Sequence, residues 1–126
     1  MKPEAQEWID KEEGDRKVAQ REMQTADPVW NVVCFLAEQC AEKYLKAFLE
    51  EQGIPFEKTH DLMVLLDLTG GQLPELEAMR PQLAYLSPFA ITARYPGVQT
   101  NQQTAEVTSQ IAGQVRTVVR AKLGLA

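Results

Sequence analysis

The stretch from residue 33 to residue 49 constrains the fold most, because its pattern is that of one long amphipathic helix. Apolar and small residues recur three and four positions apart, the period of a helix with one buried face. Such a helix is marginal alone in water, so it must pack against others. The apolar positions are Val33, Leu36, Ala37, Cys40, Ala41, Tyr44, Ala47 and Phe48. We expect the opposite face to be solvated; it carries Glu38, Gln39, Glu42, Lys43 and Lys46.

Length and composition fit one globular domain spanning residues 1–126. Charged residues make up 25% and hydrophobic residues 44% of the chain, which is ordinary for a soluble protein. No apolar run approaches the roughly 20 residues that cross a bilayer, and the N-terminal segment lacks the apolar core of a signal peptide. The sequence therefore predicts a cytoplasmic protein with no membrane association.

The two cysteines, Cys34 and Cys40, lie six residues apart on the same predicted helix. Six residues of helix rise about 9 Å, which is too far for a disulfide. No Cys-x-x-Cys occurs, and the single histidine is distant in sequence. The pattern favours two small buried side chains over the alternatives, a metal site or a catalytic thiol. We expect no metal and no cofactor.

The net charge of −5 argues against a general nucleic-acid binder. The charge is unevenly distributed, because residues 93–126 carry four basic side chains and one acidic one, whereas residues 1–92 carry nine basic and seventeen acidic. A basic terminal segment on an acidic body could face phosphate, an acidic partner or the protein's own first helix. The last of these needs no ligand and is the simplest.

Helical spacing extends along the whole chain, and no segment alternates apolar and polar residues as a strand does. This pattern predicts an all-α fold, an antiparallel up-and-down bundle of four main helices with one or two additional short helices. We expect helices over about 4–25, 28–52, 60–68, 74–79, 81–93 and 101–123, with a kink at Pro88.

Residues at the expected helix ends support these boundaries. Asp27, followed by proline, is typical of a helix start, and Gly53 is typical of a left-handed C-terminal cap. Thr59 is a good N-cap for the short helix from 60 to 68. Thr100 and Gln103 match the Thr-x-x-Gln capping box of a final helix.

At this point the sequence resembles a HEPN domain. Residues 34–47 are similar to the family pattern C-F-x-x-Q-Q-A-x-E-K-x-L-K-A. Thr59-His60-Asp61-Leu62 follows a glycine-containing loop, and Ala93-Arg94-Tyr95-Pro96 precedes the final helix, as in the family. The first helix, with Asp15 in residues 13–19, also resembles the family's usual start. The motifs are individually modest, but they cover most of the chain in the family's order.

The resemblance implies a four-to-five-helix bundle, usually a homodimer, with a role toward nucleotides or RNA. Many relatives act with a minimal nucleotidyltransferase as a toxin–antitoxin pair. Catalytic relatives are metal-independent RNases that carry Arg-x4-6-His near the start of the last helix. Counting from Arg94, the histidine would fall where Gln99, Thr100 and Asn101 stand. This chain lacks an imidazole there to move a proton from a ribose 2′-hydroxyl, so we expect no RNase chemistry at that position.

Arg94 is the strongest candidate ligand-binding residue. It lies in an expected turn, where functional residues concentrate, and its forked guanidinium suits phosphate. The structural alternative, of equal weight, is an ion pair with Asp15 or Glu42. The adjacent Tyr95 could stack on a base or pack beneath its own turn.

The other candidates are His60, Asp61, Lys43 and Lys46. His60 could touch an anion at a helix N-terminus, although capping or packing is the commoner role, and Asp61 complements the helix dipole. Lys46 is placed to pair with Glu42 four residues earlier, and either lysine could line a dimer cleft beside Arg94.

Three functions remain open. The first is a non-catalytic partner of a nucleotidyltransferase that associates with nucleotide or RNA. The second is an endoribonuclease toxin that uses Arg94, with His60 brought beside it in space. The third is a protein-interaction domain with a purely structural role.

Overall fold

The computed structural model describes residues 1–126 and consists of helices and connecting loops, without strands. This confirms the predicted all-α class. The α-helices are α1 (Pro3–Met23), α2 (Trp30–Gln52), α3 (Leu62–Leu68), α4 (Pro74–Glu77), α5 (Arg80–Leu86) and α6 (Gln102–Lys122), and two 3-10 helices, η1 (Ser87–Ala90) and η2 (Thr92–Arg94), follow α5.

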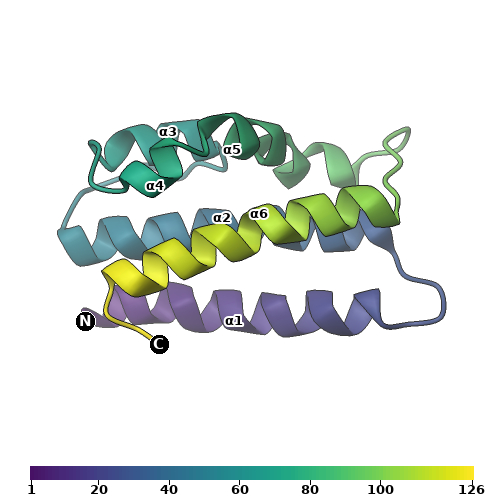
Figure 1. The fold of residues 1–126 in the computed structure, drawn as a ribbon, viewed down its shortest axis with the longest axis horizontal. Helices are drawn as coiled ribbons and strands as arrows, with labels where there is room; N and C mark the ends of the chain where they lie inside the picture. Colours follow the sequence, from purple (N-terminus) through teal and green to yellow (C-terminus); the bar gives the residue numbers. More distant parts are fainter.

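The long helices α1, α2 and α6 form the body of the bundle (Figure 1). The chain runs along α1, returns antiparallel along α2, goes back through the short helices α3 to η2, and returns along α6. The short helices therefore take the place of one long helix in an up-and-down bundle. Both α1 and α6 pack along α2, which makes α2 the central helix. No helix combines the length and the apolar character that crossing a membrane requires.

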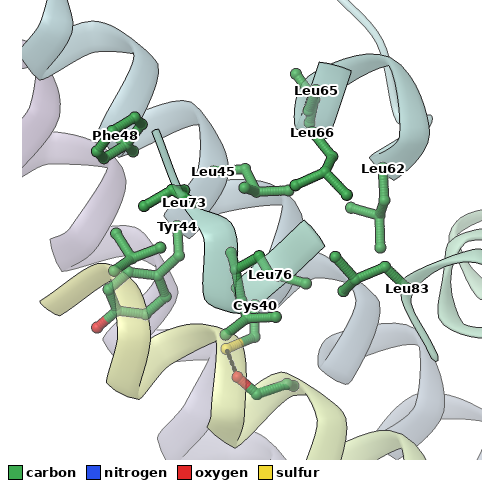
Figure 2. Close-up of a cluster of buried hydrophobic side chains, with 14 of the residues drawn as sticks. Cys40, Tyr44, Leu45, Phe48, Leu62, Leu65, Leu66, Leu73, Leu76 and Leu83 are labelled. Atoms are coloured by element: carbon green, nitrogen blue, oxygen red, sulfur yellow. Dashed lines mark hydrogen bonds between the residues drawn. The ribbon is translucent and has the colours of Figure 1, made fainter. Parts of the chain in front are cut away.

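The core lies mainly between α2 and the short helices, where leucines interdigitate (Figure 2). Burial of each leucine contributes about 1.5 to 3 kcal/mol, which is why such short helices are held in place. The fully buried leucines are Leu45, Leu49, Leu62, Leu65, Leu66, Leu73, Leu76, Leu83 and Leu86.

Both cysteines are free and buried, as the small-side-chain interpretation predicts. Cys40 donates its thiol hydrogen toward the Ala112 carbonyl of α6, with a sulfur–oxygen distance of 3.7 Å (Figure 2). This contact joins α2 to α6 in the middle of the bundle.

The predicted start of α2 is wrong by two residues. The helix begins at Trp30, and Asp27 does not cap it. Instead, the Glu22 carboxylate at the end of α1 accepts a hydrogen bond from the Val29 backbone N–H at 2.9 Å. A side chain from the preceding helix thus satisfies a donor that a local cap was expected to satisfy. At the other end, Gly53 is the C-cap with φ of +69°, as predicted.

The short helix α3 also begins two residues later than predicted. Its N-cap is Asp61, whose carboxylate accepts from the Met63 N–H at 2.9 Å, and the prediction that Thr59 caps this helix is wrong. The Thr59 hydroxyl accepts from the Asp61 N–H at 3.1 Å and so shapes the loop before the helix. His60 consequently lies in that loop and not in the first helical turn.

The proline-rich segment is divided more finely than predicted. The helix α5 ends at Leu86, and η1 and η2 replace its expected continuation to residue 93. Because Pro88 has no N–H to donate, the chain tightens into 3-10 turns from this point. The change of axis brings Arg94, at the end of η2, to the surface of the bundle.

The last helix has Asn101 as its N-cap, so the predicted capping box at Thr100 is wrong. The Asn101 side chain accepts from the Thr104 N–H at 2.9 Å. The Thr100 hydroxyl instead donates to the Asn31 side-chain oxygen on α2. A contact between helices therefore takes the hydroxyl away from the local capping role.

We expect Asn101→Ala to lower the free energy of unfolding by about 1 kcal/mol, because a first-turn N–H loses its acceptor. The measurement is urea denaturation followed by circular dichroism. The matched control is Gln103→Ala, since Gln103 is exposed and makes no capping contact. A larger loss from the Gln103 change than from the Asn101 change would restore the capping-box interpretation.

Candidate functional site

Three charged side chains on consecutive turns of α2 are buried, contrary to the prediction that this face is solvated. We call Glu38, Glu42 and Lys46 the α2 charge row; their exposed fractions are 0%, 2% and 4%. The loop that follows α2 accounts for part of this burial, since it places His60 against Glu42. On the α1 side, the Lys46 ammonium lies 5.1 Å from the centre of the Trp8 ring. The burial therefore depends on neighbours that are distant in the sequence.

Glu42 is the centre of the row because it contacts both Lys46 and His60. Its Oε2 lies 3.3 Å from the Lys46 Nζ, which confirms the predicted pair, and its Oε1 lies 2.7 Å from the His60 Nδ1. An ionised carboxylate can only accept, so the Nδ1 of His60 carries the hydrogen. The other ring nitrogen, Nε2, remains available, and about half of the His60 side chain (52%) is exposed. Glu42 thereby orients the imidazole.

Glu38 carries the most perturbed carboxyl group of the row. Burial, reinforced by the nearby Glu42 charge, raises the pKa of Glu38 to about 8, although the positive charges of Lys46 and Arg94 oppose the shift. Gln39 donates to one Glu38 oxygen at 2.8 Å, and the other oxygen has no partner in the protein. Glu38 is therefore largely neutral at pH 7, and the row carries no excess negative charge.

Arg94 lies beside the row and is exposed. Its guanidinium carbon stands 5.2 Å from the centre of the Phe35 ring on α2, a cation–π arrangement. The alternative prediction, an ion pair with Asp15 or Glu42, is wrong, because those carboxylates pair with Lys43 and with Lys46 and His60, respectively. No protein group accepts a hydrogen bond from the Arg94 side chain, so its N–H fork is free for a ligand.

Of the other three candidate residues, Tyr95 is free, whereas Asp61 and Lys43 already have partners within the protein. Tyr95 follows Arg94 and is 59% exposed, so its ring does not pack beneath its turn. Asp61 is occupied as the cap of α3. Lys43 binds Asp15 on α1, which separates it from the pair of Lys46 and His60 on Glu42.

The structure thus brings His60 and Lys46 into contact with Glu42. The positive charge of Arg94 lies near Glu38, one helical turn earlier on α2, and opposes the rise of its pKa. Sequence reasoning treated both glutamates as solvent-facing and missed their part in the site. The spacing of residues 38, 42 and 46, four apart, was the available signal, since such residues share one helix face. No group of three or more metal-binding side chains is arranged to hold a metal ion.

Comparison with known proteins identifies the family. The family model described as HEPN domain matches residues 5–122, nearly the whole chain. Comparisons with curated proteins and with solved structures find no match. The helical bundle, the three motifs and this match agree, and they support a nucleotide- or RNA-associated module. The chain therefore belongs to the HEPN domain family.

Proposed function

We propose that this protein is a non-catalytic, nucleotide- or RNA-associated module that acts as the partner of a nucleotidyltransferase in a toxin–antitoxin-type system. The observation that carries the binding part is the free guanidinium of Arg94, held on Phe35 next to the α2 charge row. Arginine binds phosphate with two parallel N–H donors, and a guanidinium fixed in place loses less entropy on binding. The adjacent Tyr95 ring is exposed and able to stack on a base.

The electrostatics of the row are compatible with a phosphate at Arg94. Glu42 is neutralised by Lys46 and contacts His60, and burial keeps Glu38 largely protonated at neutral pH. A bound phosphate would therefore face Arg94 and the exposed edge of His60 without a strongly repelling carboxylate. The acidic body of the protein limits such binding to this locality.

The non-catalytic part of the proposal rests on the residues that follow Arg94. Positions 99 to 101 hold glutamine, threonine and asparagine, none of which exchanges a proton near neutral pH. The pairing with a nucleotidyltransferase, and the homodimer usual in the family, rest on the family relationship.

A second candidate, an endoribonuclease, is favoured by the contact between Glu42 and His60. With Nδ1 donating to Glu42, Nε2 would accept the proton of a ribose 2′-hydroxyl as a general base. Arg94 would stabilise the charge that develops on the phosphate. This candidate requires Arg94 and His60 to contact the same phosphodiester.

We expect Arg94→Ala to weaken binding of a fluorescein-labelled single-stranded RNA by about tenfold, because one charge-assisted contact is lost. Fluorescence anisotropy at several salt concentrations measures this, and the magnitude of the salt slope should fall by about 0.7. The matched control is Arg21→Ala, since Arg21 is exposed and forms no ion pair.

Equal weakening by both arginine changes would contradict a site at Arg94. If the unmodified protein does not bind RNA, the function that remains is that of a protein-interaction domain. The partner is tested separately, by determining whether the neighbouring gene encodes a nucleotidyltransferase and whether that enzyme co-purifies with this protein. Absence of such a gene, or failure to co-elute, would remove that part of the proposal.

A further inference from the structure

A hollow lies between α1 and α6 and is lined by Leu36, Ala37 and Cys40 of α2, a set that shares no residue with the charge row. We call it the α1–α6 pocket; its volume is about 220 Å³. Toward one end of the molecule, Glu13 on α1 bonds to Arg116 and Arg120 on α6 and holds the two helices together. Toward the other end α1 and α6 diverge (Figure 1). The pocket occupies this divergence, with Cys40 of α2 among the residues that line it.

The pocket contains a buried carboxyl group that no protein group satisfies. Glu12 is fully buried, and neither of its oxygens has a hydrogen-bond partner. A buried polar group without a partner costs about 1 to 3 kcal/mol, so such groups are uncommon in folded proteins. The Cys40 thiol lies near Glu12 and favours its ionised form, but the thiol hydrogen is directed to the Ala112 carbonyl, so the carboxyl keeps no hydrogen-bond partner.

Arg16 lines the same pocket one helical turn after Glu12 and forms no ion pair. Glutamate followed by arginine four residues later is an order that favours pairing on a helix. The two side chains nevertheless form no ion pair, so the Arg16 guanidinium at the pocket and the buried Glu12 carboxyl beneath it each lack a charged partner. The rest of its lining is largely apolar, with Gln20 and Ser109 as the polar exceptions; the apolar part includes Ala19, Met23, Leu36, Ala37 and Ala112.

We propose that the α1–α6 pocket binds a small zwitterion, an α-amino acid with an apolar side chain. Its ammonium group would donate to Glu12, its carboxylate would accept from Arg16, and its side chain would contact Met23 and Leu36. A simple amine would leave Arg16 facing another cation, and a simple acid would leave Glu12 unsatisfied. Entry requires rotation of the long rim side chains of Arg16 and Gln20, which are partly or fully exposed.

Isothermal titration calorimetry with L-leucine, at concentrations up to about 10 mM, tests this proposal. We expect Glu12→Gln and Arg16→Gln each to weaken leucine binding by about tenfold or more. Glu7→Gln and Arg21→Gln are the matched controls, because both residues are exposed on α1 outside this pocket. Isoamylamine and 4-methylpentanoate, which lack the carboxylate and the amine of leucine, should bind at least tenfold more weakly.

The number of protons released when leucine binds is an independent measurement of the role of Glu12. Burial, with the nearby charges of Glu13 and Asp15, raises the pKa of Glu12 to about 7, while the neighbouring Cys40 thiol and the Arg16 charge oppose the shift. An ammonium that pairs with Glu12 at pH 7 therefore releases part of a proton, and the binding heat depends on the ionisation enthalpy of the buffer. That dependence should disappear in Glu12→Gln.

Three results would overturn the proposal: no heat with leucine, methionine or valine; isoamylamine binding as tightly as leucine; or unchanged binding in both pocket variants. None of these results bears on Arg94, so the pocket and the RNA site are tested independently.

Discussion

Replacing Glu42 with alanine should destabilise the protein by about 3 to 5 kcal/mol, the largest effect that we expect from one substitution. Glu42 is 2% exposed and holds the Lys46 ammonium and the His60 ring. Without the carboxylate, Lys46 remains 4% exposed as an uncompensated charge. Urea denaturation of the purified variant measures the loss. Glu57→Ala is the control, since Glu57 is exposed in the loop after α2 and changes there typically shift stability by less than about 0.5 kcal/mol.

The double variant Glu42→Leu with Lys46→Met distinguishes a buried charge from lost packing. Removing both charges should recover much of the stability that Glu42→Ala loses, because no ion is left without a partner. A double variant as unstable as the single one would mean that packing, and not charge, makes the row sensitive. A loss below about 1 kcal/mol for Glu42→Ala would show that the row is not buried in solution.

Stability should fall as the pH rises from 6 to 9, opposite to the usual behaviour of a protein held by ionised carboxylates. Burial raises the pKa of Glu12 from 4.5 to about 7 and that of Glu38 from 4.5 to about 8. A carboxyl whose pKa is raised on folding contributes its full stability below pH 4.5 and loses it as the pH rises through the folded value. The cost above pH 8 is on the order of 3 kcal/mol for Glu12 and on the order of 5 kcal/mol for Glu38.

The measurement is the free energy of unfolding at a series of pH values. Glu12→Gln and Glu38→Gln should each flatten the profile and raise stability above pH 8, since a neutral amide replaces a group that must ionise there. Glu7→Gln, on the exposed face of α1, should leave the profile unchanged. A profile of the unmodified protein that is level or rises between pH 6 and 9 would contradict the burial of both carboxyls.

Below that range, Glu13 has the reverse effect. Burial alone would raise its pKa, but the hydrogen bonds from Tyr44 and Arg116 lower it below 4.5. Its contribution is present above pH 4.5 and is lost as the pH falls through the folded value. Glu13 therefore does not contribute to the fall of stability between pH 6 and 9, which we attribute to Glu12 and Glu38.

The helices and their arrangement follow closely from local sequence patterns. Apolar periodicity places all three long helices, and Gly53 ends α2 because a left-handed residue is needed there. The helix starts are less predictable, since several side chains compete for the same N–H groups. Glu22 reaches Val29 from another helix, and Asn31 draws Thr100 away from α6. These contacts depend on how helices meet, which no local motif specifies.

In the candidate site too, individual residues can be predicted from the sequence, whereas the contacts between them cannot. Arg94, His60 and Lys46 can be selected from their chemistry and position in the chain. Their grouping cannot, because His60 reaches Glu42 only after its loop has folded onto α2. For the same reason the sequence pattern predicts a solvated face where the structure has the buried α2 charge row. Periodicity distinguishes an apolar face from a polar one, but it does not reveal which polar face a neighbouring loop covers.

We propose that Arg94 and His60 contact RNA without cleaving it. The most direct test is to incubate a labelled single-stranded RNA with the purified protein in the absence of metal, beside Arg94→Ala and His60→Ala, and to separate the products on native and denaturing gels. We expect intact RNA that is shifted by the unmodified protein and shifted less by Arg94→Ala. RNA that is cleaved by the unmodified protein and left intact by both variants would contradict this proposal and assign the protein as an endoribonuclease.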